Sequence, residues 1–365
     1  MNEVNFFNAN FKEMVFMHMA DALLSPAVGG VMWVAAAGTL AYSATKLSKG
    51  DLEDLDNPKS ISFDKKIPLM GVLGAFVFAS QMINYTIPGT GSSGHIGGGI
   101  LLASLLGPEA GFLTLASVLV IQCLFFADGG LLALGCNMIN MGFFACFIGF
   151  PFIYKKILKN GFTPTKIMIA SIISVVISLQ LGAFGVVCET MLSGVTELPF
   201  STFVILMQPI HLAIGLVEGI LTGCVLIFIY NAKPELLIGY DGSSVKENVS
   251  VKKVALVLVV VAALIGGGLS LFASANPDGL EWSIQKVTGS TELDRSNNVS
   301  KTLESVQEST AFLPDYAFKS DAENTAGTSV SGIVGSAITL GLAALIGFGA
   351  SKVKKTSDNN TKKHA

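Results

Sequence analysis

The sequence predicts an all-α membrane protein, a bundle of helices that crosses the bilayer several times. Of the 365 residues, 51% are hydrophobic and only 13% are charged, and a soluble domain carries about twice that charged share. Several apolar runs approach or exceed ~18 residues, the length of a spanning helix. Lysines gather between these runs, as they do in the cytoplasmic loops of membrane proteins.

The expected spans follow one another along the chain, and one apolar segment differs from the rest. The run GGGILLASLL reaches Gly107-Pro108 after about ten apolar residues, which is too short for an upright span. We expect a short or broken helix that is packed inside protein there. The other expected spans are 27–45, 67–84, 112–127, 138–154, 167–187, 203–230, 254–273 and 332–350.

The distribution of charge predicts the orientation. Lysines mark the loops 46–66, 155–166 and 231–253 and the C-terminal tail, and the positive-inside rule places all four in the cytoplasm. With the short segment counted as a crossing, about nine crossings satisfy these placements, with the N-terminus outside and the C-terminus inside. Segment 276–331 is then outside. It holds nine acidic and four basic residues, and its polar composition predicts a partly disordered loop.

Two membrane units are expected. The first, 17–240, contains about seven spans. The second, 251–351, is a pair of helices joined by the extracellular loop 276–331. Residues 1–16 form an N-terminal extension without the basic start and long apolar core of a signal peptide, and residues 352–365 form a cytoplasmic tail.

The Gly-rich loop 85–99, YTIPGTGSSGHIGGG, is the stretch around which we expect the chain to be organised. Glycine allows the backbone to approach a ligand closely. Irregular backbone beside a span is tolerated only where it is buried in protein or lines a cavity. His95 is therefore expected to be held in place; the alternative is a plain turn with a surface histidine.

His18 and His95 are the candidate metal ligands. His18 precedes the first span and His95 lies in the Gly-rich loop, so both are expected outside and can meet. Two imidazoles at a non-helical site suit a divalent late first-row metal, whereas each alone is also explained as a polar residue at the membrane interface. Asn84 and Asp128 lie near the same outer loops and are expected to hydrogen-bond to the ligands.

His211 and Glu218 are seven residues apart, on one face of a helix. Ionisable groups inside a span usually face the bundle interior, so a functional role and a structural hydrogen bond both remain open for this pair. His364 lies in the tail and is set aside.

Several classes of function are excluded. There is no Walker A motif, so this chain does not itself hydrolyse ATP, and there is no HExxH motif. Basic residues do not alternate with aromatic ones, which argues against nucleic-acid binding. The five cysteines form no CxxC pair and are interpreted as small buried hydrophobic residues.

The motifs resemble those of a known family. MHMADALLSP at 17–26 and PGTGSSGHIGG at 88–98 look like the substrate-binding membrane subunit of cobalt and nickel energy-coupling-factor (ECF) transporters, the CbiM and NikM type. The runs QCLFFADGG at 122–130, NMINM at 137–141 and HLAIGLVE at 211–218 are similar to its other landmarks. NPDGLEW at 276–282 resembles a fused "PDGLE" module of the CbiN or NikN type.

The resemblance implies an ECF S-component-like bundle in a prokaryotic cell membrane. Such a subunit is not an enzyme, and it imports Co2+ or Ni2+ together with a transmembrane coupling (T) subunit and cytoplasmic ATPase (A) subunits. Its ligands would be four nitrogens in a roughly planar arrangement: the free amine of Met17, the backbone nitrogen and imidazole of His18, and the imidazole of His95. Such a donor set favours Ni(II) and can hold Co(II). Asn84, Ser92, Ser93 and Asp128 are the expected partners of the ligands.

Met17 departs from the family pattern. Sixteen residues precede it, so its nitrogen is a peptide nitrogen, which is a poor donor unless it is deprotonated. We expect translation to start at Met17. Removal of the tail and a differently built site are the alternatives.

Two other functions compete with metal import. An intramembrane serine protease would use Ser93 of the sequence GSSG as nucleophile and His211 as base, although this motif lies in a loop and His18 would have no role. A metal channel or carrier would differ from the ECF type in needing no ATPase partner.

Overall fold

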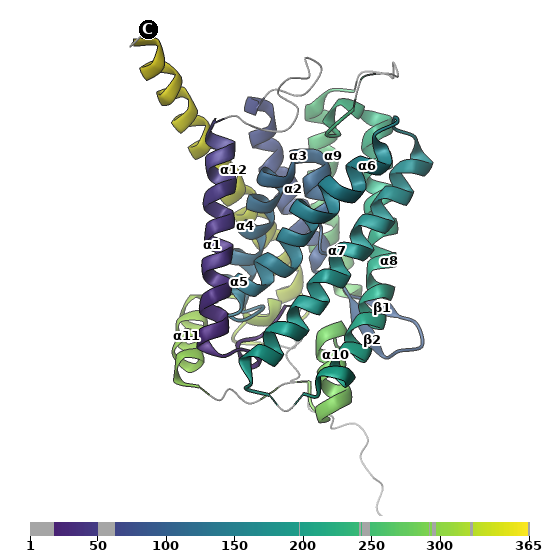
Figure 1. The fold of residues 1–365 in the computed structure, drawn as a ribbon, viewed down its shortest axis with the longest axis vertical. Coiled ribbons are helices and arrows are strands. Elements are labelled where there is room, and N and C mark those ends of the chain that lie inside the picture. Colours follow the sequence, from purple (N-terminus) through teal and green to yellow (C-terminus); the bar gives the residue numbers. More distant parts are fainter. Residues whose placement is uncertain are drawn as a thin grey trace, which may run out of the picture.

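The computed structural model describes residues 18–49, 63–196, 198–240, 242, 249–291, 293, 297–321 and 324–363. Met17 and the extension 1–16 therefore lie outside the described residues. In the described part, the chain forms a bundle of long helices with a small two-stranded hairpin at one end (Figure 1). The predicted all-α class is confirmed.

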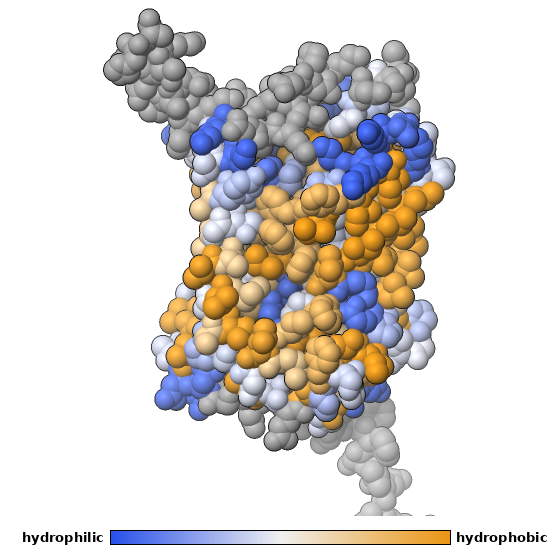
Figure 2. All heavy atoms as spheres, in the orientation of Figure 1, coloured by the Kyte–Doolittle hydropathy of each residue, from blue (hydrophilic) through white to orange (hydrophobic). Residues whose placement is uncertain are grey.

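Six helices are long and apolar enough to cross a membrane among the described residues. On the face drawn in Figure 2, the middle of the molecule is mostly hydrophobic, and hydrophilic residues lie toward both ends. These helices are α1 (Pro26–Lys49), α4 (Pro108–Phe126), the continuous helix Leu134–Leu158, α7 (Pro164–Ser193), α8 (Phe200–Ala232) and the apolar part, Ala326–Lys352, of α12 (Ala326–Lys363). The expected spans 67–84 and 254–273 form α2 (Phe63–Gln81), whose apolar part Lys66–Gln81 is shorter than the six, and α9 (Val251–Gly267), which is also outside the six.

The continuous helix Leu134–Leu158 has a π-helical interior. It consists of α5 (Leu134–Asn137), η2 (Met138–Tyr154) and α6 (Lys155–Leu158). The short 3-10 helices of the described residues are η1 (Asp21–Leu23), η3 (Pro234–Leu236), η4 (Leu269–Phe272) and η5 (Pro314–Tyr316).

The short apolar segment after the Gly-rich loop forms α3 (Gly99–Leu106), and all eight of its residues are buried. This helix ends at Gly107, whose φ of 90° is a conformation that favours glycine. Pro108 then starts α4, where its missing N–H costs nothing. A short helix packed inside protein, as predicted from the sequence, is therefore found.

The Gly-rich loop is more regular than expected. Its two arms, β1 (Tyr85–Ile87) and β2 (Ser92–Gly94), pair antiparallel with Tyr85 opposite Gly94. Gly89 and Gly91 in the turn between them have φ values of 78° and 75°. The hairpin brings His95, the residue after β2, to the edge of the bundle interior.

The prediction of disorder for 276–331 is wrong for most of the described residues in that segment. They form α10 (Gly279–Thr288) and α11 (Asn298–Thr310). The side chain of Asp278 caps α10 and Glu281 completes a capping box, while Asn297 caps α11. Polar residues that suggested disorder thus supply helix caps and partners for the rest of the chain.

Helix α12 packs closely on α2 and α9 through small residues. Ser331, Gly335, Thr339, Ala343 and Gly347 recur at every fourth position of α12. A Cβ on Gly71 of α2 would meet the carbonyl oxygen of Leu340 at 2.7 Å. Small residues at such spacing allow two helix backbones to approach closely in a membrane.

The two ends of the bundle differ. The hairpin, α10 and α11 lie at one end, and α6 and the C-terminal end of α12 lie at the other (Figure 1). The candidate site lies toward the first of these ends.

Candidate metal centre

His18 is held by a clamp on its neighbour, Met19. The N–H of Met19 donates to Oδ1 of Asn137 at 3.1 Å, and Nδ2 of Asn137 donates back to the carbonyl of Met19 at 3.3 Å. The N–H of Gly130 donates to the same carbonyl at 3.0 Å. The backbone of Met19, and with it the neighbouring His18, is therefore fixed to the start of the helix Leu134–Leu158.

His95 is held through the glycines that follow it. The N–H of Gly98 donates to Oε1 of Glu218 at 2.9 Å, and Nε2 of Gln81 donates to the carbonyl of Gly97 at 3.0 Å. Helices α8 and α2 thereby fix the turn between the hairpin and α3. The sequence leaves open whether Glu218 has a functional role or forms a structural hydrogen bond, and this contact supports the structural hydrogen bond.

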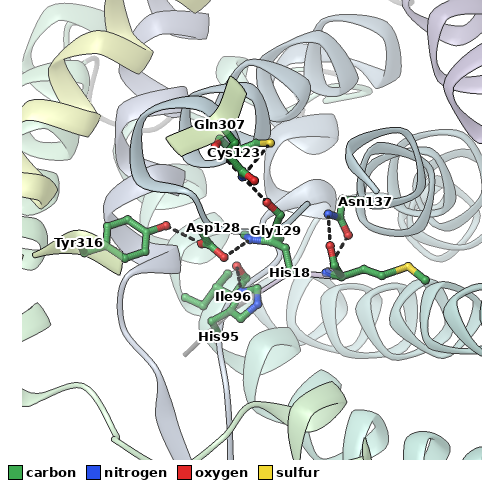
Figure 3. A network of polar contacts seen from close by, with 10 residues as sticks. His18, His95, Ile96, Cys123, Asp128, Gly129, Asn137, Gln307 and Tyr316 are labelled. Carbon is green, nitrogen blue, oxygen red and sulfur yellow. Dashed lines mark hydrogen bonds and ion pairs between the residues drawn. The ribbon is translucent and has the colours of Figure 1, made fainter. Parts of the chain in front are cut away.

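The two imidazoles meet, as the sequence predicted. Their ring centroids are 5.4 Å apart and the rings are tilted by 56°, and they lie side by side in Figure 3. Two imidazoles that share one ion have centroids about 4.5 to 6.3 Å apart, because metal–nitrogen bonds are about 2.0 Å long. Both rings line a cavity of about 110 Å³. Nε2 of His18 is buried and has no hydrogen-bond partner among the described residues.

Asp128 connects His18 to a distant part of the chain. Its Oδ1 lies 3.0 Å from Nδ1 of His18, and its Oδ2 accepts a hydrogen bond of 2.6 Å from the hydroxyl of Tyr316 (Figure 3). Burial raises the pKa of this carboxyl, but His18 and Tyr316 outweigh burial and hold the pKa below its ordinary value. Burial and Asp128 raise the pKa of Tyr316 well above its ordinary value, so its hydroxyl remains a donor.

Asp278, the first acidic residue of the PDGLE sequence, also lines the cavity. Burial raises the pKa of this carboxyl to about 6. A carboxylate near two imidazoles favours a cation over an anion in the same space.

Ser92 and Ser93 face the PDGLE sequence instead of a base. The hydroxyl of Ser93 donates to the carbonyl of Asn276 at 2.7 Å, and that of Ser92 donates to the carbonyls of Ser93 and Pro277. Neither hydroxyl hydrogen-bonds to His211 in the described structure. The arrangement lacks the contact between nucleophile and base on which the protease interpretation depends.

Of the two remaining candidate residues, His211 lines the cavity and Asn84 does not. His211 lines it, and its Nδ1 is 2.7 Å from the carbonyl of Met207. Asn84 is absent from the described lining, and its backbone carbonyl accepts the N–H of Ser274 at 2.7 Å. The backbone of Asn84 therefore contacts the segment that leads to the PDGLE sequence.

The described side chains provide two imidazoles and few other donors. Among the described residues, no group of three or more His, Cys, Asp and Glu side chains could hold a metal ion. An ion between His18 and His95 would need donors of another kind. The amine of Met17 remains a prediction, since this residue lies outside the described part.

Sequence reasoning missed two residues that hold the site. Tyr316 and Gln307 lie in a segment that composition alone marked as disordered, and no local pattern links either one to Asp128 or α4. The sequence places Asn137 in the motif NMINM but does not reveal that its side chain holds the backbone of Met19. Its position three residues before Asn140, at the start of an apolar run, is the available signal.

The comparisons with known proteins divide the chain in two. Residues 18–236 match the family "cobalt uptake substrate-specific transmembrane region" (CbiM), and residues 252–352 match the PDGLE domain. A protein of Archaeoglobus fulgidus that carries the name fused nickel transport protein NikMN is 32% identical over 93% of this chain and 100% of its own length. The cobalt transport protein CbiM of Sorangium cellulosum is 30% identical over 47% of this chain and 76% of its own.

A crystal structure titled as a truncated transition metal transporter is 31% identical, covers 58% of this chain and 98% of its own, and has a TM-score of 0.48. The family match covers more than half of the described bundle and includes both histidines of the site. The chain belongs to the CbiM family of cobalt uptake substrate-specific transmembrane proteins, and a PDGLE domain is fused to its C-terminal side.

Proposed function

We propose that this chain is the substrate-specific membrane subunit of an ATP-driven importer of Co2+ or Ni2+. The observation that carries the proposal is the meeting of His18 and His95 at a buried cavity. Imidazole nitrogen is a preferred donor for late first-row metals, whereas Mg2+ and Ca2+ prefer oxygen.

The ion would be captured at the outer face. The lysines of the loop around α6 lie at the end of the bundle opposite the hairpin, and the positive-inside rule assigns such loops to the cytoplasm. The hairpin, α10 and the two histidines would then face the outside. The two units 17–240 and 251–351 are proposed as a metal-binding unit and an accessory unit.

Met17 is the proposed third ligand. Its free amine would complete the set of four nitrogen donors with the backbone nitrogen and imidazole of His18 and the imidazole of His95, provided that the chain starts there. Transport against a gradient needs energy, and the sequence contains no Walker A motif. A transmembrane coupling subunit and ATPase subunits are therefore the proposed partners.

The test is metal content and affinity of the purified protein in two versions, one that begins at Met1 and one that begins at Met17. We expect the Met17 version to bind about one Ni(II) or Co(II) and to ignore Mg(II). His18→Ala and His95→Ala should each abolish binding. His364→Ala is the matched control, because this histidine follows the last span. Equal binding by both versions would rule out the amine of Met17 as a ligand. Unchanged binding in both His18→Ala and His95→Ala would rule out the site.

Nickel uptake by cells distinguishes the proposed ATP-driven importer from the alternative, a carrier that needs no ATPase. Cells that contain this chain without any coupling or ATPase subunit should retain nickel on the protein and not accumulate it. Accumulation without those partners would favour a carrier that needs no ATPase.

A further inference from the structure

A second cavity lies at the end of the bundle opposite the hairpin, around α6 (Figure 1). Its volume is about 370 Å³, against about 110 Å³ for the cavity at the two histidines. It is lined by the end of η2, by α6 and the turn after it, and by Ile238 and Gly239 after η3. The metal centre described above makes no use of this space.

The lining of this second cavity is basic. Lys155, Lys156 and Lys159 contribute to it, and no acidic side chain is among the described residues that line it. The side chains of Lys156 and Lys159 are exposed. Three ammonium groups around one space favour an anion over a cation in it. The cavity is therefore unsuited to the transported metal and suited to a negatively charged group.

A further lysine removes an obstacle to anion binding at this place. The carbonyls at the end of a helix carry its partial negative charge, and that charge would repel an anion. Nζ of Lys166 donates to the carbonyls of Asn160 at 2.9 Å and Gly161 at 3.4 Å, in the turn that follows α6. Lys166 therefore offsets the negative end of this helix.

Aromatic rings form a fixed wall of the cavity. Tyr154 and Phe162 belong to the lining. The ring of Phe162 packs against Tyr230 and Tyr240, with centroids 6.5 Å and 5.7 Å apart, and the hydroxyl of Tyr230 donates to the carbonyl of Phe162 at 3.0 Å. The cavity is thus part of the packed bundle and more than a gap between long lysine side chains.

The cavity lies where a spanning helix leaves the apolar band. The candidate span Leu134–Leu158 ends at α6, and Figure 2 shows hydrophilic residues around α6 directly beside hydrophobic surface. Four residues before Lys156, Phe152 is 57% exposed, and Nζ of Lys156 lies 5.8 Å from the centroid of its ring. Lysines at the end of a span extend toward the level of the lipid head groups.

We propose that this lysine cavity, lined by Lys155, Lys156 and Lys159, binds the phosphate group of an anionic bilayer lipid. A phosphodiester supplies the negative charge and the acceptor oxygens that ammonium groups bind. The acyl chains of the lipid would lie along the exposed apolar surface beside Phe152. Basic pockets between spanning helices bind anionic head groups on the cytoplasmic side of membranes. The inference is independent of the metal centre.

The test measures lipid bound to the full chain in detergent by native mass spectrometry. Phosphatidylglycerol is titrated as the anionic lipid and phosphatidylcholine as the zwitterionic one. The variant combines Lys156→Gln with Lys159→Gln. The matched control combines Lys252→Gln with Lys253→Gln, because these two lysines are also exposed, lie in the next lysine loop and are not among the described residues of the lining. Thermal midpoints without added lipid check that both proteins fold.

We expect the wild-type chain to bind phosphatidylglycerol at least about tenfold more tightly than phosphatidylcholine. The Lys156 and Lys159 variant should lose about tenfold or more of this affinity, since each lysine near anionic lipid contributes about fivefold. The Lys252 and Lys253 control should bind as the wild type does. Inorganic phosphate, added at constant ionic strength, should displace little phosphatidylglycerol, because it lacks the acyl chains.

Three outcomes would overturn the inference. An equal loss of affinity in the two double variants would show that the overall charge of this end of the bundle, and not the cavity, attracts the lipid. Equal binding of the two lipids by the wild-type chain would show that the phosphate charge is not recognised. Saturable binding of inorganic phosphate that depends on Lys156 and Lys159, without retention of phosphatidylglycerol, would assign the cavity to a soluble anion.

Discussion

The N–H of Gly98 and the carboxylate of Glu218 form a buried hydrogen bond of 2.9 Å between the turn after His95 and the middle of α8. Gly98 has a φ of 81°, so the turn uses a conformation that favours glycine. The position of His95 therefore depends on an acidic side chain inside a spanning helix.

Glu218→Ala is expected to weaken metal binding and to lower the free energy of unfolding by about 1–3 kcal/mol, because a buried N–H loses its acceptor. Glu218→Gln retains an oxygen that can accept this hydrogen bond and should have a smaller effect. Calorimetric titration with Ni(II) and thermal unfolding in detergent measure the two effects. Equal behaviour of the Ala and Gln variants would contradict this role.

Asn137→Ala is expected to release the segment His18–Met19. The substitution removes both hydrogen bonds between Asn137 and the backbone of Met19, each worth about 1 kcal/mol. We expect a lower Ni(II) affinity, and faster hydrogen exchange at the amide of Met19. Asn160→Ala is the control, since Asn160 is exposed at the opposite end of the bundle. An unchanged exchange rate at Met19 would show that the clamp is dispensable.

Trp282→Phe is expected to loosen the hairpin. The indole of Trp282 donates to the carbonyl of Thr90 at 3.0 Å, and Phe keeps an aromatic ring but no donor. The loss should be about 1 kcal/mol, visible as faster hydrogen exchange of the amide of Ser93, which donates to the carbonyl of Pro277 at 2.8 Å. The amides of α7, which are remote from this contact, serve as the internal reference; a uniform change in both would point to a general loss of stability.

Gly335→Ala is expected to separate α12 from α2. A Cβ at this position would collide with the buried ring of Phe78, and such overpacking typically costs 1–3 kcal/mol. Gly341→Ala is the matched control on the same helix, because its Cβ would meet no atom within 4 Å. The control should be neutral or slightly more stable, since Ala favours helix over Gly by about 1 kcal/mol. Thermal midpoints that fall equally in both variants would refute the close packing.

The features that the sequence predicted well are local. Apolar length and flanking lysines identify six of the expected spans among the described residues without any knowledge of their partners, and Gly107-Pro108 alone is enough to end α3. The motifs around His18 and His95 identify the pair of imidazoles, because each histidine lies in a distinctive stretch of sequence. Their meeting in the structure confirms that part of the prediction.

The features that the sequence did not reveal depend on distant pairs. Gln307 is polar and lies in a polar segment, so composition gives it no structural value until the carbonyl of Cys123 is placed beside it. The same holds for Tyr316, which binds a carboxylate 188 residues earlier in the chain. A disordered segment and a segment whose polar groups cap another unit have similar compositions, and only tertiary contacts distinguish them.

The close fit of α12 against α2 has a consequence for biosynthesis. A chain emerges from the ribosome N-terminus first, so α2 enters the membrane long before α12 exists. Until then, the groove around Gly71 and Gly74 that α12 fills must be covered by lipid or by the insertion machinery. Tyr316, which precedes α12, also reaches Asp128 only at this late stage. The helix bundle and the contact between Tyr316 and Asp128 are thus completed together, when α12 is synthesised.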